Sequence, residues 1–414
     1  MLPHDRGAGR GSSRLDPVGN RLAINWKIGL PTGWGVYGLN LALELVRKGV
    51  FPVILEANPA LDITELTAFL LKEALTAYRA LGDGSVGNIR GEALDCPVLQ
   101  PLGDRLWFPE RFANRPGQPD IGVVFFEHVD IPPADLERAA SLPLIIAGSD
   151  WNAQVLRGLG LGNVAVCPQG VDLSLFHPGP RRNLFPDQFL IFSGGKFEYR
   201  KGQDLVLAAF RAFQERHSEA RLVCAWSNLW PASMADMAAS PHVIGLPQAD
   251  GHGELELAPW LADNGIPPET VFPIRLRRNS LMPQILRECD LALFPSRCEG
   301  GTNLVAMEAM ACGVPTILSA NTGHRDLLGP HILSLTHQGP VANGTGREGW
   351  GESEVEEMLA AMEQAWADRE ALRQLGLAGA AFMADWSWSH QVDRLLEAIS
   401  HYASAAGSDE WVKK

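Results

Sequence analysis

The chain has 414 residues, of which 46% are hydrophobic and 20% charged, and its formal net charge is −13 at pH 7. This length suits two globular domains of roughly 150–200 residues each, and the negative charge provides no general basic surface, which argues against nucleic acid as a partner. Because no apolar run approaches the ~18–20 residues of a membrane span and the opening residues lack the hydrophobic core of a signal peptide, we expect a cytoplasmic protein with at most peripheral membrane contact.

The first half of the chain alternates segments predicted as strands and helices. Residues 1–20 are rich in Gly, Arg and Ser, and we expect them to be disordered. The residues that follow predict a βαβ unit with glycines at its first turn. Its segments are the strand Arg21–Ile28, the loop Gly29–Gly35, the helix Val36–Arg47 and the strand Phe51–Glu56.

Two glycines of that first loop, Gly33 and Gly35, are candidate ligand contacts. They lie in the sequence GLPTGWG, but no third glycine follows at the spacing of the dinucleotide-binding fingerprint. On spacing alone, the pair fits either a turn or a ligand contact.

Residues 58–120 show a weaker pattern, with one helix predicted over Thr64–Leu81 and then a Gly- and Pro-rich stretch. A helix is expected after Ser149 or Asp150, either of which can serve as its N-cap. Short apolar runs predict three further strands, Ile121–Phe126, Leu144–Ala147 and Val164–Cys167.

His128 directly follows one of these strands in the sequence FFEHVDIP. It is either a structural histidine or a ligand contact, because α/β folds bind ligands at the carboxyl ends of parallel strands. Glu127, its neighbour, is the second candidate at this position.

The second half begins with the strand Phe189–Ser193, followed by GGKFEYRKG and a helix from about Gln203. Further strands are predicted at Arg221–Ala225 and Val271–Pro273. The turn after the first strand holds three cations within six residues, which is typical either of a solvated face or of a phosphate-binding turn. Its candidate residues are Gly195, Lys196, Arg200 and Lys201.

The most informative stretch is LALFPSRCEGGTNLVAMEAMACGVPTILS, residues 291–319. It predicts a strand at Leu291–Phe294, a glycine-bearing loop, a helix from Asn303 and a strand at Thr316–Ser319. Gly313 followed by Pro315 marks the end of that helix. Thr302 or Asn303 can cap its N-terminus, which is a ready anion site.

Glu308 is the only charged residue of this helix, which is apolar on all sides and therefore expected to be buried. A buried carboxylate needs a partner. Three interpretations are open. The carboxylate pairs with a structural Arg or Lys, it lies at a solvated edge of the helix, or it accepts hydrogen bonds from the hydroxyl groups of a sugar or ribose.

The stretch PSRCEGGTNLVAMEAMACGVPTI resembles the signature of the glycosyltransferase group 1 family, whose members are retaining, nucleotide-sugar-dependent enzymes of the GT-B fold. The resemblance implies that Glu308 holds the ribose hydroxyls and that Glu299 contacts the transferred sugar. Here eight residues separate these two glutamates, one more than the family pattern of seven. Counted back from Glu308, Gly300 would occupy the slot of the first glutamate.

Other segments extend the resemblance. Lys201 matches a family lysine that binds the donor pyrophosphate, and Lys196 stands where an arginine is usual. In the family, the loop matching Gly33 and Gly35 faces the donor phosphates, and a residue at the position of His128 reaches the sugar. The resemblance therefore names the catalytic residues Glu299, His128, Lys201 and Lys196, and the substrate-binding residues Glu308, Gly33, Gly35, Gly195, Arg200, Gly300, Gly301, Thr302, Asn303 and Leu304. His324 is a weaker candidate.

The resemblance also implies a fold: two Rossmann-like domains with a cleft between them. Segments similar to the family linker and crossover place the boundary near residue 180 and the crossover at Trp386–Trp388. The expected parts are an acceptor domain of residues 21–180, a donor domain of residues 181–385, and a helix of residues 386–404 that returns to the first domain.

No two aspartates in this chain are separated by a single residue, so the Asp-x-Asp metal clamp of the other common nucleotide-sugar fold is absent. Lys196, Lys201 and the helix end at Asn303 can neutralise the leaving diphosphate instead. We therefore expect a metal-independent enzyme with no cofactor, a nucleotide-sugar donor, by default a UDP-sugar, and an unidentified acceptor (glycan, lipid-linked or protein). The alternatives are a GT-B-fold sugar-nucleotide epimerase or hydrolase and a catalytically silent binding subunit.

Overall fold

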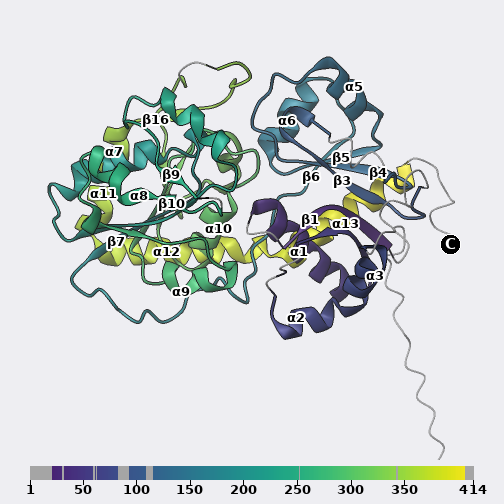
Figure 1. Ribbon diagram of the computed structural model, residues 1–414, viewed down its shortest axis with the longest axis horizontal. Helices are drawn as coiled ribbons and strands as arrows, with labels where there is room; N and C mark the ends of the chain where they lie inside the picture. Colours follow the sequence, from purple (N-terminus) through teal and green to yellow (C-terminus); the bar gives the residue numbers. More distant parts are fainter. Residues whose placement is uncertain are drawn as a thin grey trace, which may run out of the picture.

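The computed structural model describes residues 21–29, 32–58, 61, 63–82, 93–108, 115–250, 252–341 and 344–405. The expectation for residues 1–20 lies outside the described residues. Two six-stranded parallel sheets, each with helices packed against it, stand side by side (Figure 1). This is the predicted α/β architecture of two Rossmann-like domains.

The first sheet has the strand order β2-β1-β3-β4-β5-β6, with every pair parallel. Most of its strands are continuous buried apolar runs, as expected of a parallel sheet covered on both faces. Its strands are β1 (Arg21–Ile28), β2 (Phe51–Ala57), β3 (Val98–Leu102), β4 (Asp120–Val124), β5 (Leu144–Ala147) and β6 (Val164–Val166), and its helices are α1 (Gly33–Arg47), α2 (Glu65–Leu70), α3 (Lys72–Gly82), α5 (Pro133–Ser141) and α6 (Asp150–Gly158).

The second sheet has the order β11-β8-β7-β12-β13-β14, again all parallel. Its strands are β7 (Phe189–Lys196), β8 (Ala220–Ser227), β11 (Val271–Pro273), β12 (Leu291–Phe294), β13 (Thr316–Ser319) and β14 (Leu333–Leu335). Two small antiparallel pairs lie outside it, β9 (Gln248–Ala249) with β10 (Leu255–Glu256) and β15 (Gln338–Gly339) with β16 (Glu352–Ser353). The helices are α7 (Gln203–Gln214), α8 (Leu257–Asp263), α9 (Met282–Leu286), α10 (Leu304–Ala311), α11 (Val355–Ala367) and α12 (Arg369–Met383).

The last helix, α13 (Trp388–Ala405), returns to the first half, as the resemblance implies. In Figure 1, α12 runs along the second half and α13 continues beneath the first sheet. Ser387 forms an isolated parallel bridge with Val171, and Trp388, Leu395 and Ile399 belong to the apolar core of the first half. The C-terminal helix therefore joins the two halves.

Several predicted boundaries were wrong. α1 begins at Gly33 rather than Val36, because the Thr32 side chain accepts a hydrogen bond from the Gly35 N–H and caps the helix three residues earlier. β7 continues to Lys196, since β8 pairs with it as far as Ser227.

The single helix predicted over Thr64–Leu81 is two helices, α2 and α3. They are separated at Leu71, whose side chain is fully buried, whereas no residue of α2 is buried.

All six cysteines are buried and unpaired. Among the residues that the structure describes, no helix is both long enough and apolar enough to cross a membrane.

Candidate functional site

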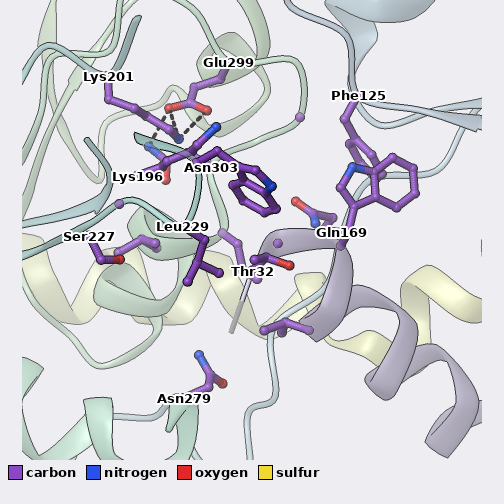
Figure 2. A pocket seen from close by; sticks show the side chains of 18 of the residues that line it. Thr32, Phe125, Gln169, Lys196, Lys201, Ser227, Leu229, Asn279, Glu299 and Asn303 are labelled. Atoms are coloured by element: carbon purple, nitrogen blue, oxygen red, sulfur yellow. Dashed lines mark hydrogen bonds and ion pairs between the residues drawn. The ribbon is translucent and has the colours of Figure 1, made fainter. Parts of the chain in front are cut away.

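A cavity of about 650 Å³ lies between the two halves, and residues of both line it (Figure 2). The first half contributes residues at or after the ends of β1, β3, β4 and β6, and the second half contributes residues at or after the ends of β7, β8, β11 and β12. These are the carboxyl ends of parallel strands, where open α/β sheets bind ligands.

Arg297 fixes the loop that follows β12. Its guanidinium is fully buried and bonds both oxygens of Asp204, with Nη1–Oδ1 at 2.8 Å and Nη2–Oδ2 at 2.7 Å. Its Nε donates to Glu352 at 2.6 Å, and its guanidinium carbon lies 3.7 Å from the ring centroid of Tyr199. Sequence reasoning missed this arginine, because its two carboxylate partners are 93 and 55 residues away along the chain.

Glu299 is the centre of the loop's polar contacts. Lys201 Nζ lies 2.7 Å from each of its carboxylate oxygens, and Ser296 and Asn303 donate to it at 2.7 and 3.0 Å. Burial alone would raise its pKa, but the charges of Lys201 and Arg200 outweigh burial and lower the pKa of Glu299 to about 2. This carboxylate is therefore ionised and faces the cavity.

The cations of the β7 turn have carboxylate partners. Lys196 pairs with Glu198 at 2.5 Å and lies 4.9 Å from the ring of Trp230. Arg200 reaches Glu198 at 2.9 Å, and Glu127 and Glu299 at 3.4 Å each.

Burial lowers the pKa of Lys201, and the nearby Glu299 counteracts part of this effect. Lys196, Arg200 and Lys201 all line the cavity, as does Gly195.

The N-terminus of α10 faces the same space. Asn303 is the N-cap, with φ at +60°, and its side-chain oxygen accepts from the Ala306 N–H. The predicted cap is thus confirmed at Asn303 rather than Thr302. Gly301, Asn303, Leu304 and Val305 line the cavity, and the first N–H groups of any α-helix lack intrahelical partners.

Glu308, one turn further along α10, is 5% exposed and lines the cavity. Its partner is neutral: Asn279 Nδ2 donates to its Oε1 at 2.7 Å. Burial raises the pKa of Glu308 to about 8, and the hydrogen bond from Asn279 only partly opposes that rise. Asn279 is 29 residues away in the chain, and no sequence signal identified it.

His128 does not line the cavity. Its Nδ1 lies 2.8 Å from Asp104 Oδ2, and its ring packs 5.1 Å from that of Trp350. Burial would raise the pKa of Asp104, but the hydrogen bonds from His128 lower it to about 2. Asp104 and Glu127 line the cavity instead, so the role expected of His128 stays a prediction.

Three more of the predicted site residues, Gly35, Gly300 and Thr302, do not line the cavity. Gly35 is buried in the first turn of α1, whereas Gly33 lines the cavity. A Cβ on Gly300 would come within 2.5 Å of the carbonyl oxygens of Phe125 and Phe126, so this glycine allows the two halves to approach closely. Thr302 is fully buried, with its hydroxyl 3.0 Å from the Met307 sulfur.

His324 is also fully buried, bonded to Asn303 at 3.0 Å and Ser319 at 2.9 Å. Burial lowers its pKa to about 4, so it is neutral near pH 7. These contacts suit a residue that positions the Asn303 cap.

Other cavity residues were not recognised from the sequence. They come from loops without periodicity or from isolated polar positions, and they meet only when both halves are folded. The main ones are Trp34, Asp104, Trp107, Gln169, Trp230 and Asn279.

Comparison with known proteins relates the second half of the chain to one enzyme family. Residues 180–339 match the family model described as glycosyl transferases group 1. The match covers less than half of the chain. The second half, which holds Lys196, Lys201, Glu299 and Glu308, is the part that matches.

Two similar curated relatives are D-inositol 3-phosphate glycosyltransferases. The one from Segniliparus rotundus is 28% identical over 280 residues, covering 64% of this chain and 55% of the relative. The one from Mycolicibacterium smegmatis is 29% identical over 269 residues, covering 63% and 53%. The chain thus spans about half the length of these relatives.

Solved structures share the fold at low identity. Sucrose-phosphate synthase from Thermosynechococcus elongatus has a TM-score of 0.65 at 16% identity, covering 93% of this chain and all of its own. Anabaena HepE in complex with UDP and glucose has a TM-score of 0.63 at 14% identity, covering 92% of this chain and 99% of its own. The fold is that of the GT-B glycosyltransferases, with two Rossmann-like domains.

Proposed function

We propose that the chain is a retaining, metal-independent glycosyltransferase that moves a hexosyl group from a nucleotide-diphosphate sugar to an acceptor. One observation supports this most: Lys196, Lys201, the N-terminus of α10, Glu299 and Glu308 line one cavity. Cations and free N–H groups suit a diphosphate, and carboxyl groups suit hydrogen bonds with hydroxyl groups. The UDP in the Anabaena neighbour supports a uridine donor.

In this proposal the bond between the anomeric carbon and the diphosphate oxygen breaks, and its electron pair leaves with the diphosphate. Lys196, Lys201 and the N–H groups of Leu304 and Val305 hold the departing charge. Glu299, kept ionised by Lys201 and Arg200, accepts hydrogen bonds from hydroxyl groups of the transferred sugar and orients it. The acceptor oxygen then bonds to the anomeric carbon on the face that the diphosphate leaves, and a phosphate oxygen takes its proton.

A sugar-nucleotide hydrolase or epimerase remains the second candidate, because one observation favours it. It requires a first-half carboxylate in the cavity, and Glu127 meets this requirement. Release of nucleoside diphosphate without any acceptor, at the same rate as with one, would favour the hydrolase; interconversion of donor sugars would favour the epimerase.

We expect EDTA to leave the turnover of a donor unchanged. The described residues contain no group of three or more His, Cys, Asp or Glu side chains placed to hold a metal ion. The reason for the expectation is the pair of lysines and the helix end at one site, which can stabilise the leaving group by themselves. Loss of activity with EDTA and its recovery with Mn²⁺ would contradict this charge assignment.

The affinity for UDP-glucose should rise with pH between 6 and 8. Glu308 has a pKa of about 8 in the free protein, so most of it is protonated at pH 7. A ribose hydroxyl donates best to the ionised form, and the pyrophosphate diester of UDP-glucose does not itself titrate in this range. We expect roughly a tenfold gain in affinity from pH 6 to pH 7 and a plateau above pH 8, measured by calorimetric titration.

Two variants separate the roles of the glutamates. Glu308→Gln should flatten this pH dependence and weaken binding of bare UDP. Glu299→Gln should leave the pH dependence in place, because Glu299 stays ionised throughout, and should lower transfer instead. An identical nucleotide defect in both variants would show that Glu299 does not contact the sugar.

A further inference from the structure

The two walls of the cavity differ in charge. Among the described residues that line the second-half wall, five are cations (Lys196, Arg200, Lys201, Arg275 and Arg277) and two are carboxylates. The described part of the first-half wall has one cation, Lys27, and two carboxylates. The second-half wall suits a diphosphate, whereas the first-half wall does not favour an anion.

The first-half wall is also aromatic, with Trp26, Trp34, Trp107 and Phe125 lining it. The Trp34 ring packs edge-on against Phe125 at 5.0 Å and against Trp26 at 5.2 Å between centroids, so neighbouring rings hold it in place. Trp107 is 61% exposed. Aromatic faces placed beside hydrogen-bonding groups fit a ligand that has both apolar and polar sides.

Gln169 provides an independent sign of a ligand. It is only 7% exposed and lines the cavity, yet its side-chain amide makes no hydrogen bond with any described residue. Its Oε1 lies 3.4 Å from the position of a Cβ on Gly301, and its Nε2 lies 3.8 Å from that of a Cβ on Gly33. The side chain therefore stands between the two walls (Figure 2). The amide opens into the cavity, and an amide can both donate to and accept from hydroxyl groups.

The two carboxylates of the first-half wall, Asp104 and Glu127, differ in how many hydrogen-bond partners they already have. Asp104 already accepts from the Glu127 and His128 N–H groups and from the His128 ring. Among the described residues, Glu127 has one ion-pair contact, to Arg200 at 3.4 Å, and its partly buried carboxylate faces the cavity. Glu127 can therefore accept a hydrogen bond from a ligand hydroxyl on this wall, whereas a phosphate there would lie beside two carboxylates and a single cation, Lys27, among the described residues.

We propose that Trp34, Gln169 and Glu127 form an acceptor subsite for a neutral polyhydroxylated ring, a sugar or cyclitol without a phosphate group. The ring would stack on Trp34, with its hydroxyls on Gln169 and Glu127. This proposal rests on the proposed function and specifies its acceptor class. It sets the chain apart from the relatives whose names specify an inositol phosphate.

The test is saturation-transfer NMR on the full chain, with and without saturating UDP. The probes are two matched pairs: glucose with glucose 6-phosphate, and myo-inositol with D-inositol 3-phosphate. We expect the neutral member of at least one pair to bind at least tenfold more tightly than its phosphorylated partner. Trp34→Ala and Gln169→Ala should each reduce the saturation-transfer signal of that neutral ring at least fivefold, while changing the affinity for UDP less than twofold. Gln374→Ala, at an exposed amide on α12, is the matched control.

Each outcome decides one proposal. Tighter or equal binding of the phosphorylated members, no binding of either neutral ring, or unchanged binding in both variants would overturn the acceptor subsite. A chain that binds the neutral rings but none of the UDP-, GDP- and ADP-sugars would contradict the proposed function and leave the subsite standing.

Discussion

Arg297→Leu is expected to lower the free energy of unfolding by about 3–5 kcal/mol, because it leaves Asp204 charged and buried without its guanidinium partner. Both side chains are fully buried, so solvent cannot replace the lost contacts. The corresponding fall in melting temperature is roughly 10 °C. Because Arg297 fixes the loop that carries Glu299, nucleotide binding should weaken in the same variant.

Urea unfolding, followed by the fluorescence of the tryptophans, measures this change. Arg297→Lys should lose part of the stability, because lysine keeps the charge but not the planar fork that bonds both Asp204 oxygens. Arg216→Leu is the matched control, since its side chain is 58% exposed and its pair with Glu363 lies at the surface. A stability of Arg297→Leu within 1 kcal/mol of the parent would show that this ion-pair cluster does not support the loop.

Lys201→Ala is expected to weaken UDP binding by roughly ten- to a hundredfold and uridine binding by less than threefold. A charge-assisted contact with phosphate contributes on the order of 1.5–3 kcal/mol to binding. Uridine has no phosphate group, so its binding does not include this contact. The Glu299 carboxylate keeps Arg200, Ser296 and Asn303 as partners, so the loop should stay folded.

Calorimetric titration of the parent and the variant with both ligands gives the four affinities required. Lys72→Ala, an exposed lysine at the start of α3, serves as the control for loss of one positive charge. Equal losses for UDP and uridine would remove Lys201 from the phosphate site and indicate a general disturbance of the cavity.

The bounds of a segment were predicted correctly where its local sequence pattern agrees with its place in the fold. β1, β12 and β13 have the predicted bounds, and α10 begins at a cap that the sequence placed correctly. In each case one feature, a continuous apolar run or a capping side chain, determines the local structure by itself.

β3 was missed because its sequence, VLQPL, contains a polar residue and a proline. Gln100 is buried but bonded to Asn25 and Asp120, and β1 pairs with β3 only at Val98 and Leu99. Pro101 therefore lies beyond the part of the strand that is paired on both sides. Only the assembled sheet makes these residues compatible with a strand.

The site was predictable where neighbouring residues along the chain share a role, as in the Lys196–Lys201 turn and the Glu299–Glu308 stretch. It was not predictable where distant segments meet. Arg297, Asn279 and Gln169 derive their roles from partners or walls that the tertiary structure brings together. No pattern within a short window of sequence contains that information.

The most direct test of the account is the release of nucleoside diphosphate from UDP-, GDP- and ADP-sugars by the full chain, measured with and without a panel of acceptors. We expect one donor to bind, and we expect an acceptor bearing free hydroxyl groups to accelerate the release of its nucleoside diphosphate. Its product should retain the anomeric configuration of the donor, and Glu299→Gln should lower the rate while leaving UDP binding nearly intact. Failure of all three donors to bind at millimolar concentration, or inversion of the anomeric configuration in the product, would contradict it.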